Sequence, residues 1–124
     1  MKKRVLVVDD SEIVLQKASE ALINGGFTVQ TAMSALEVDS YVLGEEKPDL
    51  VIMDVMMPEM DGDKKARLMK GDEATRLIPV LLLSSKSEDE LGSLVRESGC
   101  DGFIRKPFTD EQIVARVAEA LGEC

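Results

Sequence analysis

Short apolar runs alternate with longer amphipathic stretches along the chain. Residues 5–8, 50–53 and 80–83 are apolar at every position, the pattern of strands that are covered on both faces in a parallel sheet. Residues 27–29 form a weaker apolar run, and residues 103–104 form a short one. We therefore expect five strands.

Amphipathic stretches with helix-end signals lie between and after these runs. The first spans residues 11–24 and stops at Gly25 and Gly26. Three others open on Ser or Thr followed three residues later by Glu or Gln, the pattern of a capping box. These boxes are Ser34 with Glu37, Ser87 with Glu90, and Thr109 with Gln112. The weakest helical pattern falls within residues 62–71.

Strands that alternate with helices predict an α/β fold of the (βα)5 type. Such a chain forms a doubly wound, five-stranded parallel sheet with helices on both faces. No linker, repeat or low-complexity segment divides residues 1–124, so we expect a single domain. In such sheets the functional site lies beyond the carboxyl ends of the strands.

Composition and charge narrow the class of protein. The 124 residues are 44% hydrophobic, which is enough to form a core. The formal net charge of −9 argues against direct binding of nucleic acid, which needs a basic face. The apolar run after Lys2, Lys3 and Arg4 is cut off at Asp9 and is too short for a signal or membrane segment. We expect a cytoplasmic protein with no membrane insertion.

The residue types present exclude several kinds of catalytic site. The chain has no histidine, so Ser-His and Cys-His arrangements are absent. Its two cysteines, Cys100 and Cys124, are not clustered, which indicates neither a disulfide scaffold nor a zinc site.

Side chains that carry chemistry follow four of the apolar runs. They are Asp9 and Asp10 after the first run, Asp54 after the third, Ser84 at the end of the fourth and Lys106 after the fifth. The carboxyl ends of the strands share one edge of the sheet, so three carboxylates, a hydroxyl and an ammonium would share a small volume. Each residue alone has a structural interpretation, as a helix cap or a solvated side chain, but the set favours chemistry.

Electrostatics indicates which chemistry this set supports. Repulsion between two ionised carboxylates about 4 Å apart costs about 4 kcal/mol at an effective dielectric constant of about 20. The cluster therefore needs a cation or a proton. Oxygen-only ligands favour Mg²⁺, Mn²⁺ or Ca²⁺ over zinc, and a site completed by waters is typical of Mg²⁺. With Lys106 and Ser84 nearby, the set suits transfer of a phosphoryl group to a carboxylate.

The same residues resemble a known family. Residues 54–62, Asp-Val-Met-Met-Pro-Glu-Met-Asp-Gly, are similar to the D-x-x-M-P-x-M-D-G motif of the receiver domains of bacterial two-component response regulators. The pair at residues 9–10 and the segments 78–80 and 106–108 fall in the family's order and spacing, so the resemblance spans essentially the whole chain. It implies the flavodoxin-like strand order 2-1-3-4-5 and a signalling switch of a two-component system rather than a conventional enzyme.

The resemblance also implies the chemistry of the site. Asp54 would attack a phosphoryl donor, either a sensor histidine kinase or a phosphotransfer protein, and become an aspartyl phosphate. Asp10, Asp54 and the backbone carbonyl of Met56 would bind Mg²⁺ directly, with Mn²⁺ as an alternative metal. Asp9 would act on the metal largely through water.

The resemblance further implies a conformational switch. Ser84 would bond to the phosphoryl oxygen and Lys106 would pair with it, ahead of a cis peptide bond to Pro107. Inward movement of Ser84 would vacate space that Phe103 can fill. The surface of the fourth helix, fifth strand and fifth helix would then change and control an unknown downstream protein. The alternative interpretation of Phe103 is an ordinary core aromatic.

Three positions bear on how long the phosphoryl group stays. Ser85 stands where the family usually has Ala or Gly, so it leaves less room for the phosphoryl group. Met56 and Lys86 occupy positions that tune phosphoryl lifetime in the family. Neither offers the acid or amide that best positions an attacking water, so we expect slow self-dephosphorylation.

Other functions remain open at this point. A Mg²⁺-dependent aspartyl phosphohydrolase of the haloacid-dehalogenase type carries Asp-x-Asp, whereas Met56 stands two residues past Asp54. A pseudo-receiver, kept only as a binding module, is disfavoured by the complete acidic set with Ser84 and Lys106. We expect no output domain within this chain, which is either a stand-alone receiver or one cut from a longer protein.

Overall fold

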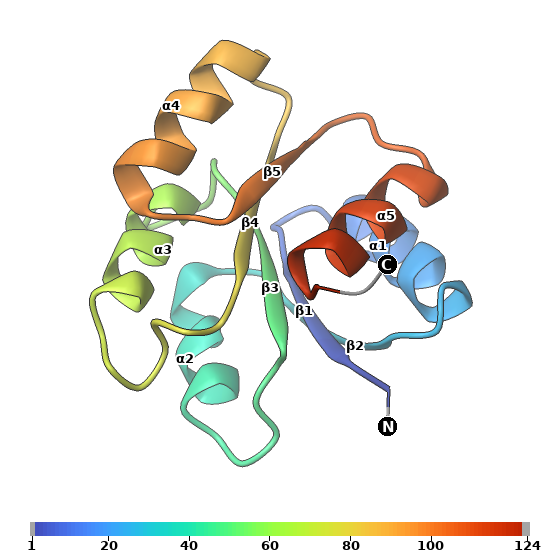
Figure 1. The fold of residues 1–124 in the computed structure, drawn as a ribbon, viewed down its shortest axis with the longest axis horizontal. Helices are drawn as coiled ribbons and strands as arrows, with labels where there is room; N and C mark the ends of the chain where they lie inside the picture. Colours follow the sequence, from blue (N-terminus) through green and yellow to red (C-terminus); the bar gives the residue numbers. More distant parts are fainter. Residues whose placement is uncertain (1, 123–124) are drawn as a thin grey trace.

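Five parallel strands form one sheet at the centre of the molecule (Figure 1). They are β1 (Arg4–Val8), β2 (Thr28–Ala32), β3 (Leu50–Asp54), β4 (Val80–Ser84) and β5 (Gly102–Arg105). Their order in the sheet is β2-β1-β3-β4-β5, which confirms the expected topology. This computed structural model describes residues 2–122.

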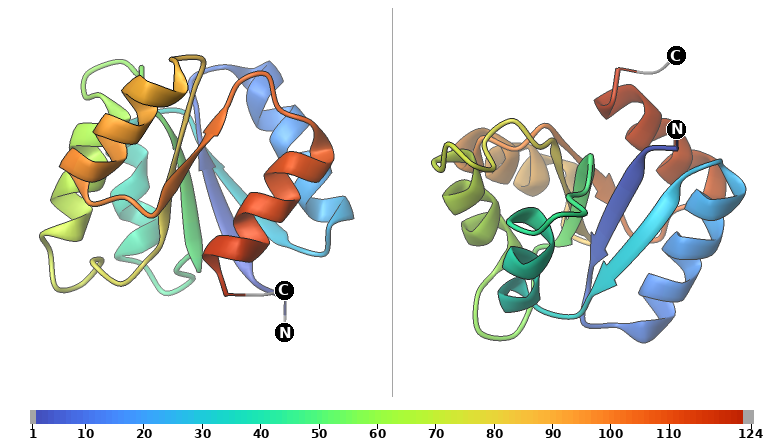
Figure 2. Two further views of the ribbon diagram at one scale, coloured as in Figure 1. Left: turned by 45° about the horizontal axis from the view of Figure 1, so that its top comes forward. Right: turned by 90° about the horizontal axis from the view of Figure 1, so that it is seen from below.

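Helices cover both faces of the sheet (Figure 2). They are α1 (Glu12–Asn24), α2 (Ala35–Val42), α3 (Gly62–Lys70), α4 (Glu88–Ser98) and α5 (Asp110–Ala120). Helices α2, α3 and α4 lie on one face, and α1 and α5 lie on the other. Because strand side chains alternate between faces, Leu6 and Val8 pack in the first core while Val5 and Val7 pack in the second.

The strand β2 is longer than the expected run at residues 27–29. It spans Thr28–Ala32, and the buried side chain of Phe27 lies just before it. As an edge strand, β2 exposes Thr28 and Thr31 to solvent. Its sequence therefore lacks the continuous apolar pattern that marks the central strands.

The three predicted capping boxes have different outcomes. The box at Thr109 is complete, with reciprocal hydrogen bonds between Thr109 and Gln112. Ser87 caps α4, because its hydroxyl accepts the backbone N–H of Glu90. The Glu90 carboxylate accepts from the Ser87 hydroxyl and not from the Ser87 backbone N–H, so the box is incomplete. The prediction of a capping box at Ser34 is wrong. The Ser34 side chain makes no cap bond, and its hydroxyl donates to the Glu37 carboxylate instead.

Two other sequence predictions concern membranes and cysteines. Within residues 2–122, no helix is both long and apolar enough to cross a membrane. Cys100 is a buried free thiol. Cys124 lies outside the described residues, so the expectation about it stays a prediction.

The start of α3 lies against the end of β3. The Gly62 N–H donates to the carbonyl oxygen of Val55 at 2.8 Å. A Cβ added at Gly62 would overlap the backbone carbonyl oxygen of Asp54. Only glycine allows the two backbones to approach this closely.

Gly62→Ala should therefore lower the free energy of unfolding by about 3 kcal/mol or more, because backbone atoms must move. The matched control is Gly92→Ala, where the nearest atom to the added Cβ is 3.5 Å away within α4. This control should raise stability by about 0.5–1 kcal/mol. Urea denaturation measures both changes, and a Gly62→Ala protein as stable as the wild type would contradict the close approach.

Candidate functional site

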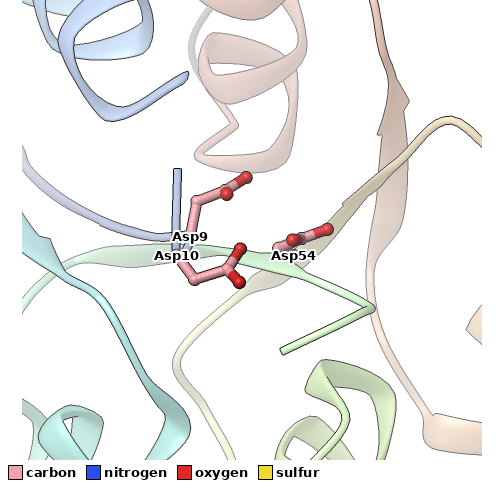
Figure 3. A group of neighbouring side chains, drawn as sticks. All are labelled: Asp9, Asp10 and Asp54. Atoms are coloured by element: carbon pink, nitrogen blue, oxygen red, sulfur yellow. The ribbon is translucent and has the colours of Figure 1, made fainter. Parts of the chain in front are cut away.

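Three aspartates meet at the carboxyl edge of the sheet (Figure 3). Asp9 and Asp10 directly follow β1, and Asp54 is the last residue of β3. These strands are neighbours in the sheet, with Val8 in register with Met53. One carboxylate oxygen from each aspartate lies within 4.8 Å of the others. The structure thus brings the three carboxylates together, as the argument from strand ends predicts.

The three aspartates differ in their access to solvent. Asp9 and Asp54 are 1% and 5% exposed, whereas Asp10 is exposed. The Asp9 carboxylate also accepts a hydrogen bond from the backbone N–H of Ser11 at 2.9 Å, which orients it. A small divalent cation fits this donor set, because all of its side-chain ligands are oxygens and its open side can keep waters.

Lys106 supplies the positive charge of the site. Its Nζ lies 2.9 Å from the Asp9 carboxylate and 3.5 Å from the Asp54 carboxylate. Its backbone N–H donates to the carbonyl oxygen of Ser84 at 2.8 Å, and its peptide bond to Pro107 is cis, as predicted. Burial lowers the pKa of the Lys106 ammonium, but hydrogen bonds and charges from Asp9 and Asp54 outweigh burial and raise the pKa. Lys106 therefore stays protonated.

Asp54 holds a proton more tightly than an ordinary aspartate does. Burial, followed by the charge of Asp9, raises the pKa of Asp54 from 3.8 to about 6. The ammonium of Lys106 and the backbone N–H of Met56 oppose this shift without cancelling it. One lysine does not neutralise two buried carboxylates, and the remaining negative charge favours a cation.

Ser84 ends β4, the neighbour of β3 in the sheet, and Ser85 and Lys86 follow it. The Ser84 side chain is buried, and its hydroxyl accepts the backbone N–H of Lys86 at 3.1 Å. Ser85 is exposed. The Lys86 ammonium lies 3.9 Å from the carboxylate of Glu90 on α4, so it turns toward the helix.

Met56 lies two residues past Asp54, and Phe103 lies on β5. The Met56 side chain is 67% exposed, so it is not a core methionine. Phe103 is half-buried and packs against the edge of the α2–α4 core, so its roles as switch and as core aromatic both stay predictions. The guanidinium carbon of Arg116 lies 5.6 Å from the centre of its ring.

An apolar groove of about 320 Å³ opens next to Lys106, and the sequence analysis does not predict it. It is lined by Ile13, Val14, Lys17, Ser85, Lys106, Pro107 and Phe108. Ile13 is 79% exposed at the start of α1. One feature of the sequence could have indicated this groove. Ile13 is a large apolar residue that lies outside the helical stripe of Val14, Ala18, Ala21 and Leu22.

Comparisons with known proteins agree with this geometry. A family model of the response regulator receiver domain matches residues 5–118. This chain belongs to the response regulator receiver domain family. Receiver domains are signalling switches and not conventional enzymes, and they bind Mg²⁺ at an acidic pocket.

Curated relatives of this receiver domain include two transcriptional regulators. The chain is 33% identical to the phosphate regulon regulatory protein PhoB of Pseudomonas aeruginosa, covering 96% of this chain and 52% of the relative. It is 34% identical to the alkaline phosphatase synthesis regulatory protein PhoP of Bacillus subtilis, covering 98% of this chain and 49% of the relative. The receiver domain thus spans about half the length of these relatives.

Solved structures share the whole fold of this receiver domain. A putative response regulator from Chloroflexus aurantiacus superposes with a TM-score of 0.92 at 26% identity, covering 99% of this chain and 100% of that chain. The chemotaxis response regulator CheY4 of Vibrio cholerae gives a TM-score of 0.88 at 27% identity, covering 97% and 99%.

The raised pKa of Asp54 makes stability depend on pH in metal-free buffer. Between about pH 4 and pH 6 the unfolded chain loses the Asp54 proton before the folded protein does, so stability falls as pH rises. Below about pH 4 both states are protonated, and above about pH 6 the full loss of about 3 kcal/mol is present.

Asp54→Asn cannot titrate, so it should gain up to about 3 kcal/mol relative to the wild type as pH rises from about 4 to about 7.5. Urea denaturation of both proteins in a chelating buffer at several pH values measures this difference. A difference that stays constant across the range would contradict the raised pKa.

Proposed function

We propose that this receiver domain accepts a phosphoryl group on Asp54 and works as a phosphorylation-dependent signalling switch. The observation that carries the proposal is the buried Asp54 carboxylate, which lies within 4.8 Å of two further carboxylates and 3.5 Å from the Lys106 ammonium. Asp10, Asp54 and the backbone carbonyl of Met56 would bind Mg²⁺, and Asp9 would act on it largely through water. The bound cation would neutralise charge on the transferring phosphoryl group.

The proposed transfer starts with the ionised Asp54 carboxylate. One of its oxygens attacks the phosphorus of a phosphohistidine on a kinase or phosphotransfer protein. The new O–P bond forms as the P–N bond breaks, and the released imidazole takes a proton from water. Lys106 then pairs with a phosphoryl oxygen, and the Ser84 hydroxyl donates to another.

The proposed switch follows from the added charge. An aspartyl phosphate carries about −2, whereas the carboxylate carries −1. Attraction of Ser84 toward the phosphoryl oxygens would move the loop between β4 and α4 and let Phe103 turn inward. Nearly complete switching requires about 5.5 kcal/mol of differential interaction. A charged group bonded by Lys106, Ser84 and a metal is a suitable source.

The α4–β5–α5 face is the proposed contact for a downstream protein. A groove of about 470 Å³ lies there, and Phe103 is part of its lining. Relatives named as transcriptional regulators are about twice as long as this chain. The partner, the cytoplasmic location and the single-domain organisation of residues 1–124 without an output domain stay predictions.

Slow self-dephosphorylation is part of the proposal. The exposed Met56 thioether cannot orient an attacking water by accepting its proton. The Lys86 ammonium is drawn toward Glu90. Ser85 carries a hydroxyl where the family usually has Ala or Gly, which would reduce the room for the phosphoryl group.

Beryllofluoride with Mg²⁺ provides the direct test, because it mimics a phosphoryl group on a carboxylate. The receiver domain named DrrB has been solved in a BeF3-activated form and is 32% identical to this chain. We expect amide NMR shifts around Ser84, Phe103 and Lys106 in the wild type and none of that size in Asp54→Asn. Glu20→Gln on α1, which removes another carboxylate, should respond like the wild type.

Equal shifts in Asp54→Asn would overturn the proposal. No Mg²⁺-dependent effect of beryllofluoride or acetyl phosphate in the wild type would favour a pseudo-receiver. Repeated release of phosphate from small phosphate esters would favour an aspartyl phosphohydrolase.

The apolar groove at Ile13 is the proposed docking surface for the phosphoryl donor protein, because Lys106 and Ser85 form part of its wall. Ile13→Ser should slow transfer from a histidine kinase that phosphorylates the wild type by about fivefold or more. Phosphorylation by acetyl phosphate, which needs no docking surface, should be unchanged.

The matched control is Leu77→Ser in the loop before β4, since Leu77 is 85% exposed and lies outside the groove. Radiolabelled phosphoryl transfer measures the rates. Equal slowing by both substitutions, or slowing with acetyl phosphate, would argue against docking at Ile13.

A further inference from the structure

Arg105 ties β5 to the loop that follows β4. The sheet register pairs Arg105 with Ser84, and the Arg105 Nε donates to the carbonyl oxygen of Lys86 at 3.0 Å. The backbone N–H of Lys86 donates to the Ser84 hydroxyl at 3.1 Å. The backbone of Lys86 is therefore held on both sides, and any movement of this loop away from β5 must break the bond to Arg105.

Arg116 holds the other element of the proposed switch. Its guanidinium lies 5.6 Å from the ring centre of Phe103, which is within the range of a cation–π contact. Its ion pair with Glu119, at 4.0 Å, stays within α5. The contact with Phe103 thus connects α5 to β5 and stabilises the half-buried position of the ring.

Both arginines line the same groove of about 470 Å³ on the α4–β5–α5 face, together with Phe103. The two contacts differ in kind, since one is a hydrogen bond to a backbone carbonyl and the other lies over an aromatic ring. They hold two different elements, and each must be released if the loop and the ring move. Independent contacts of this kind bias one equilibrium in the same direction.

We propose that Arg105 and Arg116 are positioning residues that hold the unphosphorylated arrangement of the β4–α4 loop and Phe103. This inference rests on the proposed function, because it requires those elements to move when Asp54 is modified. The apparent affinity for a phosphoryl analogue equals the intrinsic affinity multiplied by the fraction of molecules already in the competent state. Loss of either contact raises that fraction and tightens binding of the analogue.

The test is a titration with beryllofluoride at saturating Mg²⁺, followed by NMR. Arg105→Gln and Arg116→Gln should each lower the apparent Kd by about two- to fivefold, and the double variant should multiply the two effects. The effect of Arg116→Gln should disappear in a Phe103→Leu background. Loss of a positive charge near an anion site would weaken binding, so the direction of the change separates release of the switch from simple electrostatics.

Arg96→Gln on α4 is the matched control for charge. The Arg96 guanidinium bonds to Ser93 of its own helix, so its removal should not tighten binding. Unchanged or weaker binding by both Arg105→Gln and Arg116→Gln would overturn the inference, as would equal tightening in Arg96→Gln.

A second measurement does not depend on phosphoryl chemistry. In Mg²⁺-free protein, hydrogen exchange of the Lys86 amide should be about two- to tenfold faster in Arg105→Gln than in the wild type or Arg96→Gln. Absence of beryllofluoride binding in the wild type would contradict the proposed function but leave this measurement to decide the role of Arg105. Equal exchange in all three proteins would overturn that role.

Discussion

Two buried carboxylates share one ammonium at the carboxyl edge of the sheet. The Lys106 Nζ lies 2.9 Å from Asp9 and 3.5 Å from Asp54, and the exposed carboxylate of Asp10 adds a third negative charge. The site therefore keeps an excess of negative charge on two buried carboxylates and one exposed carboxylate. Burial and, second, the charge of Asp9 raise the pKa of Asp54, and the excess negative charge favours a divalent cation. The adjacency of β1 and β3 maintains the arrangement, because it prevents Asp9 and Asp54 from separating.

The convergence of the site residues could be predicted from sequence because parallel topology places every strand's carboxyl end at one edge. This prediction needs only the positions of the strands and the identity of the residue that follows each strand. The contacts between side chains could not be predicted in this way. That Lys106 lies closer to Asp9 than to Asp54, and that Arg116 covers the ring of Phe103, depends on helix packing and rotamers. The sequence predicts edge strand β2 only in part, because strand signals weaken where one side of the strand faces solvent.

The short strand β5 and the residue after it connect the site to the α4–β5–α5 face. Phe103 faces the groove on that face, Arg105 reaches the β4–α4 loop, and Lys106 enters the acidic site. Ile104, between them, packs in the opposite core with α1 and α5. Four consecutive residues thus contact the site, the loop and both faces of the sheet. Under the proposed function, this strand is the path by which a change at Asp54 would reach the surface.

The close approach of Gly62 to the Asp54 carbonyl shows that residues 54–62 serve both the fold and the proposed activity, through different residues. The carboxylate of Asp54 is the proposed phosphoryl acceptor, whereas the absence of a side chain at residue 62 is needed for α3 to start this close to the end of β3. A descendant that lost phosphorylation could replace the aspartates and still require this glycine. Gly62 is therefore a requirement of the fold, and the aspartates are a requirement of the proposed activity.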